Sequence, residues 1–184
     1  YNNPWNEQTI HVAIDNPTDR DYRAIVRQAL RYWETDGRQW ADWTDLEFTL
    51  LTGADTAEAD AVIRFGAVRQ CGGDATAPVG CAPYPTGGAF ERTPTAEIST
   101  GFTNASTQTI VRHEIGHLLG VEHAQTPAFM RPEVALQTLP RLDAVNRTNP
   151  WAQETLRVYI DDSAVPQPLE ETVSKQPDHA LGHY

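Results

Sequence analysis

Residues 113–123 read His113-Glu114-Ile115-Gly116-His117-Leu118-Leu119-Gly120-Val121-Glu122-His123. In an α-helix with 3.6 residues per turn, His113 and His117 lie one turn apart on one face, so both imidazoles can reach the same ion. Glu114 lies about 60° from His117 around the helix axis, so its carboxylate flanks that ion without binding it. The spacing therefore predicts a metal-binding helix with a carboxylate beside the metal.

Gly120 and His123 complete the pattern. Glycine accepts the positive φ that a sharp turn after the helix often needs, so Gly120 is the predicted turn glycine. The turn brings His123 back as a third ligand, and three neutral histidines leave a fourth position of a zinc ion open to water. We expect one catalytic zinc ion, with Glu114 activating the zinc-bound water for hydrolysis.

The segments around this helix show alternating or helical apolar patterns. Apolar residues at helical spacing from Tyr22 to Trp33 predict an amphipathic helix, with a capping box formed by Thr18 and Asp21 at its start. The predicted zinc helix covers about 107–119. Strands are expected at 9–14, 46–50, 61–65, 79–84 and 96–99.

The length of 184 residues suits one domain with a single core. We predict a domain over residues 1–164, followed by a Pro-rich polar tail or linker at 165–184. No run of about 18 apolar residues occurs, so no membrane-spanning helix is expected.

The formal net charge is −11, which argues against a nucleic-acid partner because phosphate binding needs a basic surface. Lys175 is the single lysine among 14 basic residues. An acidic, lysine-poor surface is typical of proteins that stay soluble in brine, although a genome that favours arginine codons gives the same composition. Both interpretations stay open.

Cys71 and Cys81 are the two cysteines, ten positions apart in a Gly/Pro-rich stretch. We predict a disulfide between them, which fits an exported protein. A free thiol that blocks the metal is the alternative. The chain begins at Tyr1, and a secretory signal or pro-segment is expected to have been removed.

The motif of residues 113–123 resembles the metzincin signature HExxHxxGxxH of zinc peptidases. In that family a methionine follows the third histidine in a Met-turn, and Met130 occupies this place in Phe129-Met130-Arg131-Pro132. The chain is most similar to the matrixins, the matrix-metalloproteinase-like metzincins. Ala59-Asp60-Ala61-Val62-Ile63-Arg64-Phe65 resembles their third strand.

The resemblance implies an α+β (α/β-like) single catalytic domain. It would contain a small, mixed, twisted sheet, an amphipathic helix, a zinc helix and the Met-turn. Residues 79–84 would form the edge strand that pairs with an extended protein or peptide substrate. The predicted protein is a secreted monomer. Ala124 stands where matrixins usually have serine, and only His11 precedes His113, so ligands for their structural zinc are missing. Calcium is not indicated, although Asp74 and nearby carbonyls could bind an ion.

Two other functions fit the same residues. An inactive zinc-containing module could bind or adhere to peptides without cutting them, which the intact Glu114 disfavours. An amidase acting on a non-peptide substrate is the second alternative. His11, His179 and His183 are interpreted as ordinary surface histidines.

Overall fold

The computed structural model describes residues 3–41, 45–51, 56–69, 78–85 and 89–140, together with Ser163, Val165, Pro166 and Leu169. The chain divides into two units, Tyr1–Pro140 and Arg141–Tyr184, and every helix and strand given below belongs to the first. The predicted boundary between residues 164 and 165 lies in the second unit, where four residues are described, so it stays a prediction.

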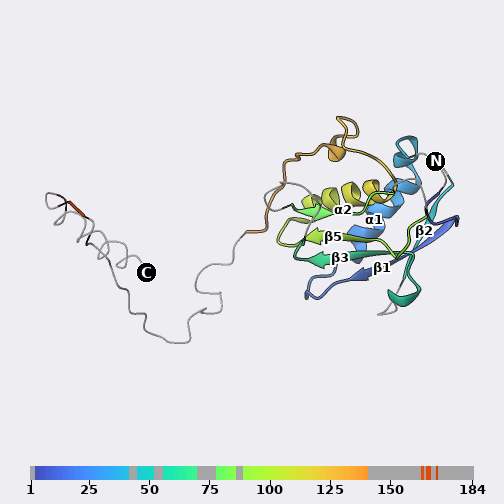
Figure 1. Ribbon diagram of the computed structural model, residues 1–184, viewed down its shortest axis with the longest axis horizontal. Coiled ribbons are helices and arrows are strands. Elements are labelled where there is room, and N and C mark those ends of the chain that lie inside the picture. The colour runs from blue at the N-terminus through green and yellow to red at the C-terminus, as the bar shows by residue number, and fades with distance from the viewer. Residues whose placement is uncertain are drawn as a thin grey trace. The chain divides into compact units, whose positions relative to one another are not determined.

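A five-stranded mixed sheet forms the centre of the first unit, in the order β2-β1-β3-β5-β4 (Figure 1). The first four strands in this order run parallel, and β4 runs antiparallel to β5. The strands span Thr9–Asp15 (β1), Glu47–Leu50 (β2), Ala61–Gly66 (β3), Gly80–Cys81 (β4) and Thr95–Ser99 (β5). The expected α+β fold with a small mixed sheet is confirmed.

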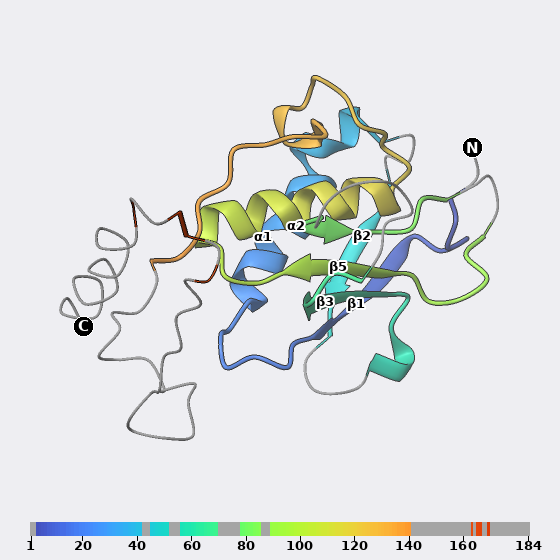
Figure 2. The ribbon, with the colours of Figure 1, turned by 60° about the vertical axis from the view of Figure 1, so that its left-hand side comes forward.

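Two helices, α1 (Arg23–Glu34) and α2 (Asn104–Leu118), cover one face of the sheet (Figures 1 and 2). The predicted apolar face of α1 is buried, as are the apolar residues Ile110, Val111 and Ile115 of α2. These side chains form one core with the inward residues of the strands, including Ile10, Ile63 and Phe65. No helix of the described residues is long and apolar enough to cross a membrane.

Short 3₁₀ turns connect these elements: η1 (Asp36–Gln39), η2 (Thr56–Glu58) and η3 (Ala128–Met130). Trp33 near the end of α1 donates its indole N–H to the Arg112 carbonyl of α2, at 3.0 Å. Its ring also packs edge-on against Phe129 in η3. Trp33 therefore joins both helices to the segment that follows the motif.

Candidate active site

Helix α2 carries His113, Glu114 and His117 and ends in a glycine turn. The amide N–H of Gly120 donates to the His117 carbonyl at 2.9 Å, and that of Val121 donates to the Gly116 carbonyl at 2.8 Å. This pair of bonds is a Schellman motif, which needs a left-handed residue after the helix. Gly120 supplies it with a φ of 77°, and the turn sends the chain back toward His123.

The three motif histidines converge through their Nε2 atoms. These atoms lie 3.0 Å apart between His113 and His117, and 3.2 Å from each of these to His123. Within the described residues, these three side chains form the group of ligand-type residues close enough to share a metal ion. The helix and the turn together thus bring three nitrogen atoms to one point.

Backbone carbonyls fix which nitrogen of each helical histidine carries the proton. His113 Nδ1 lies 2.5 Å from the Phe129 carbonyl oxygen, and His117 Nδ1 lies 2.9 Å from that of Val121. Because a carbonyl only accepts hydrogen bonds, both Nδ1 atoms must be the protonated ones in the neutral rings. The Nε2 lone pairs then point at the shared centre, as metal ligands require.

Burial keeps these two imidazoles neutral. It is the main cause that lowers the pKa of His113, and together with the neighbouring His113 it lowers the pKa of His117 to about 4. Three lone pairs facing one another repel unless a cation lies between them. Ligand nitrogens around tetrahedral zinc, at about 2.1 Å from the ion, are about 3.4 Å apart, so the donor set and its spacing fit zinc.

Glu114 lies beside this centre and is buried, with 4% of its surface exposed. Burial raises the pKa of its carboxyl from 4.5 to about 8. Strand β4 packs directly on it, because a Cβ built on Gly80 would lie 2.8 Å from both Cγ and Cδ of Glu114 and would overlap its carboxylate. The end strand of the sheet and the acidic side chain are therefore in contact.

Met130 is fully buried beneath the histidines. A Cβ built on Gly116, between the two helical histidines, would lie 2.7 Å from the Met130 sulfur. The Ala124 amide donates to the Met130 carbonyl at 2.9 Å, which closes the loop that directly follows His123. The methionine thus supports the helix turn and the loop that carry the three rings.

A cavity of about 360 Å³ opens beside the histidines and is lined by Tyr84, His117, Glu122 and His123. Tyr84 follows β4, and its hydroxyl donates to the Gly120 carbonyl. The segment after the end strand is therefore joined to the turn between the second and third histidines. Glu122 places an exposed acidic residue in the lining of this cavity.

Several contacts of the site were not predicted from the sequence. The roles of Gly80, of the Tyr84 hydroxyl and of the Phe129 and Val121 carbonyls depend on tertiary contacts, and the motif gives no signal for them. Cys81 lies in β4, whereas Cys71 and Asp74 fall outside the described residues, so the disulfide stays a prediction. His179 and His183 also lie outside the described part.

In a comparison with protein families, residues 4–144 match the family described as Matrixin. The matched region contains the sheet, both helices, the three histidines and Met130. A search of curated proteins found no match. The family match covers well over half of the chain and agrees with the geometry of the histidine cluster.

Proposed function

Because this chain belongs to the matrixin family of peptidases, we propose that it is a zinc-dependent endopeptidase whose ion is held by His113, His117 and His123. The convergence of three Nε2 atoms within 3.2 Å of one another carries this proposal. The buried carboxyl of Glu114 next to them supports hydrolysis rather than a purely structural metal site.

A bound zinc ion supplies Lewis acidity, which makes a water molecule more acidic and a peptide carbonyl more electrophilic. Glu114 is the general base that takes a proton from the attacking water. The water oxygen forms the new C–O bond to the peptide carbonyl carbon, Glu114 passes the proton to the amide nitrogen, and the C–N bond then breaks to release the amine. The carbonyls of Phe129 and Val121 hold the rings of His113 and His117 in the orientation that ligation requires.

The substrate is proposed to be a protein or peptide bound in extended form along β4. This strand ends the sheet and contacts Glu114 through Gly80, so a peptide beside it would pass close to the histidines. The cavity lined by Tyr84 and Glu122 accepts a substrate side chain next to the scissile bond.

The protein is also proposed to act as a secreted monomer, as matrixins typically are secreted. A Cys71–Cys81 disulfide would tie the residues before β4 to the strand itself and would form outside the reducing cytoplasm. The peptidase domain would cover residues 1–164, with 165–184 as a tail. Calcium is not part of this proposal, since the group of metal-ligating side chains found among the described residues is the histidine cluster.

The first prediction concerns Glu114→Ala in a quenched-fluorescence peptide library. We expect the variant to keep stoichiometric zinc, because the three ligands are untouched, and to lose turnover by about 10³-fold or more. Zinc is measured by elemental analysis and cleavage by the initial rate, with 1,10-phenanthroline as a second way to stop the parent.

Glu91→Gln is the matched control, because it removes an exposed carboxylate outside both the histidine motif and the cavity beside it. It should retain most of the activity. Cleavage by Glu114→Ala at the parental rate would refute the mechanism. Tight peptide binding without any product in the parent would instead identify a binding module, and a library left both uncut and unbound would favour a non-peptide substrate.

A further inference from the structure

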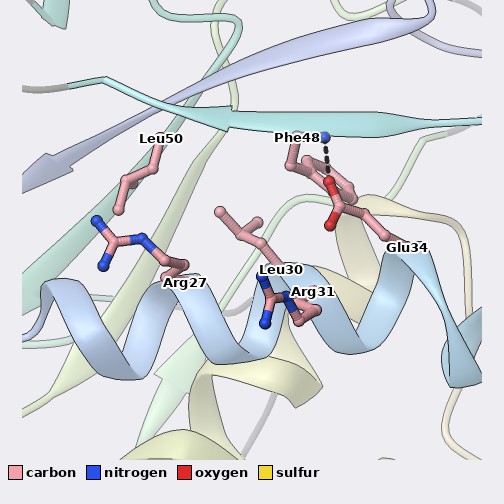
Figure 3. A pocket seen from close by; sticks show the side chains of 6 residues that line it. All are labelled: Arg27, Leu30, Arg31, Glu34, Phe48 and Leu50. Carbon is pink, nitrogen blue, oxygen red and sulfur yellow. Dashed lines mark hydrogen bonds between the residues drawn. The ribbon is translucent and has the colours of Figure 1, made fainter.

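A second groove lies at the opposite end of the sheet from β4, between α1 and strand β2. Its volume is about 230 Å³, and Figure 3 shows the six side chains that line it. The floor is apolar, with Leu30 from the helix and Phe48 and Leu50 from the strand. Polar side chains of α1 complete the lining: Arg27, Arg31 and Glu34.

The outer edge of β2 faces this groove. The amides of Glu47 and Leu51 donate to Gln8 and Val12, which directs them toward β1. Amides alternate in direction along a strand, so those of Phe48 and Leu50 point outward. The Phe48 amide donates to the Glu34 carboxylate at 2.7 Å, as Figure 3 shows. This edge therefore already binds one carboxylate group, supplied by the protein itself.

Arg27 and Arg31 give the groove a local positive charge. Both are exposed and stand one helical turn apart on the side of α1 that borders β2. The lining contains two guanidinium groups and one carboxylate, on a protein whose formal net charge is −11. Asp21 lies close enough to Arg27 for that charge to contribute to lowering the Asp21 pKa to about 2, although Arg23 is the main cause.

The spacing of the two arginines matches an extended chain. Side chains four residues apart on a helix are about 6 Å apart, and side chains two residues apart on a strand are about 6.6 Å apart. A strand laid along β2 would therefore present every second side chain to the two guanidinium groups in turn. A helical or compact ligand offers no such register with a sheet edge.

We propose that this groove binds an extended acidic peptide segment that carries Asp or Glu at alternate positions. Its backbone pairs with the outer edge of β2 at Leu50, because Glu34 already accepts from the Phe48 amide. Its carboxylates pair with Arg27 and Arg31. The methylene groups of the acidic side chains lie on Leu30 and Leu50. The site shares no residue with the histidine cluster, so it does not depend on the proposed peptidase activity.

The test uses a fluorescent octapeptide of Thr and Val with Glu at its third and fifth positions. A second peptide of the same composition carries the two Glu residues side by side. Fluorescence anisotropy is followed while the full chain with Glu114→Ala is added, so that the peptide is not cut. We expect the alternate-Glu peptide to bind about fivefold more tightly than the adjacent-Glu peptide, because only the first reaches both arginines.

Arg27→Gln/Arg31→Gln should weaken binding of the alternate-Glu peptide by about tenfold and abolish the preference between the peptides. Arg69→Gln/Arg92→Gln removes the same charge from exposed positions away from α1 and the groove and should change Kd by less than about twofold. Equal binding of both peptides, equal losses in the two double variants, or no saturable binding would each overturn the proposal.

Discussion

Among the ionisable residues of the site, Glu114 is the most deeply buried. Its pKa is about 8 in the folded protein without metal, against an ordinary value of 4.5. A carboxyl with a raised folded pKa holds its proton more tightly in the folded state than in the unfolded state. Its contribution to the free energy of unfolding is therefore complete below about pH 4.5 and is lost as the pH rises through about 8.

The second prediction follows for the metal-free protein. Between about pH 5 and pH 9 the thermal midpoint of the parent should fall, relative to that of Glu114→Gln, by about 5 °C or more. Effects of the histidines are common to both proteins and cancel. Differential scanning fluorimetry in a chelator measures the difference, and Glu122→Gln serves as the exposed control. Bound zinc should make the pH dependence of this difference in thermal midpoint smaller, because a nearby cation stabilises the carboxylate. A difference between the two metal-free proteins that does not change with pH would contradict the prediction.

How far the sequence predicts the site differs between its residues. Spacing alone predicted that His113, His117 and His123 share one centre, since helix geometry fixes the first two and Gly120 permits the turn to the third. The orientation of the rings was not predictable, because the Phe129 carbonyl reaches His113 across 16 residues of chain. The contact between Tyr84 and Gly120 spans 36 residues and has no local pattern at all.

At the scale of elements, α2 and η3 meet at a glycine. A Cβ on Gly116 would lie 2.7 Å from the Met130 sulfur, 2.9 Å from Met130 Cε and 2.9 Å from Trp33 Cζ2. Met130 is fully buried and Trp33 is 3% exposed, so neither side chain can move into solvent. The close approach of helix, 3₁₀ turn and indole therefore depends on the missing side chain.

The third prediction is that Gly116→Ala destabilises the protein by about 1–3 kcal/mol, as overpacking of a core does. The sign is informative, because helix propensity alone would stabilise such a substitution by about 1 kcal/mol. Urea unfolding followed by tryptophan fluorescence measures the change. Thr109→Ala on the same helix, where the hydroxyl bonds only within its own turn, should alter stability by less than about 0.5 kcal/mol. If Gly116→Ala were more stable than the parent, Met130 and Trp33 would be able to shift at little energetic cost and make room for the added methyl group.

The elements were predicted best where apolar residues repeat. Helix α1 follows from its buried face, but the predicted capping box was wrong: the helix begins at Arg23, and Thr18 instead donates to the Asn16 side chain in a turn. The expected strand over 79–84 is regular only at Gly80–Cys81. Pro83 has no amide hydrogen to donate, which explains why regular pairing does not continue through it.

For the whole molecule, the pattern along the chain predicted the fold class but not the order of the strands. No local sequence pattern predicts that β1 lies between β2 and β3, because that order depends on how α1 crosses over the sheet. The order places β4 at one end of the sheet against Glu114 and β2 at the other end beside Arg27 and Arg31, so the two proposed peptide-binding sites lie at separate edges.

The net charge of −11 belongs to the whole chain, and the fourth prediction concerns salt. Attraction between opposite charges, as in the ion pair of Asp15 with Arg64, acts locally. The excess negative charges, in contrast, repel one another over the entire surface. Raising NaCl from about 0.1 M to about 1 M shortens the screening length from about 10 Å to about 3 Å. We therefore expect the thermal midpoint to rise by several degrees at pH 7.

Salt also strengthens apolar burial, and a charge variant separates the two effects. Glu7, Glu91 and Glu133 are exposed, and replacing all three with Gln reduces the excess negative charge by three without touching the core. The triple variant should be more stable than the parent at about 0.1 M NaCl and equal to it at about 1 M, because screening has then removed the repulsion. The same gain from salt in both proteins would assign the effect to apolar burial, and the arginine-rich composition would then reflect codon usage rather than adaptation to brine.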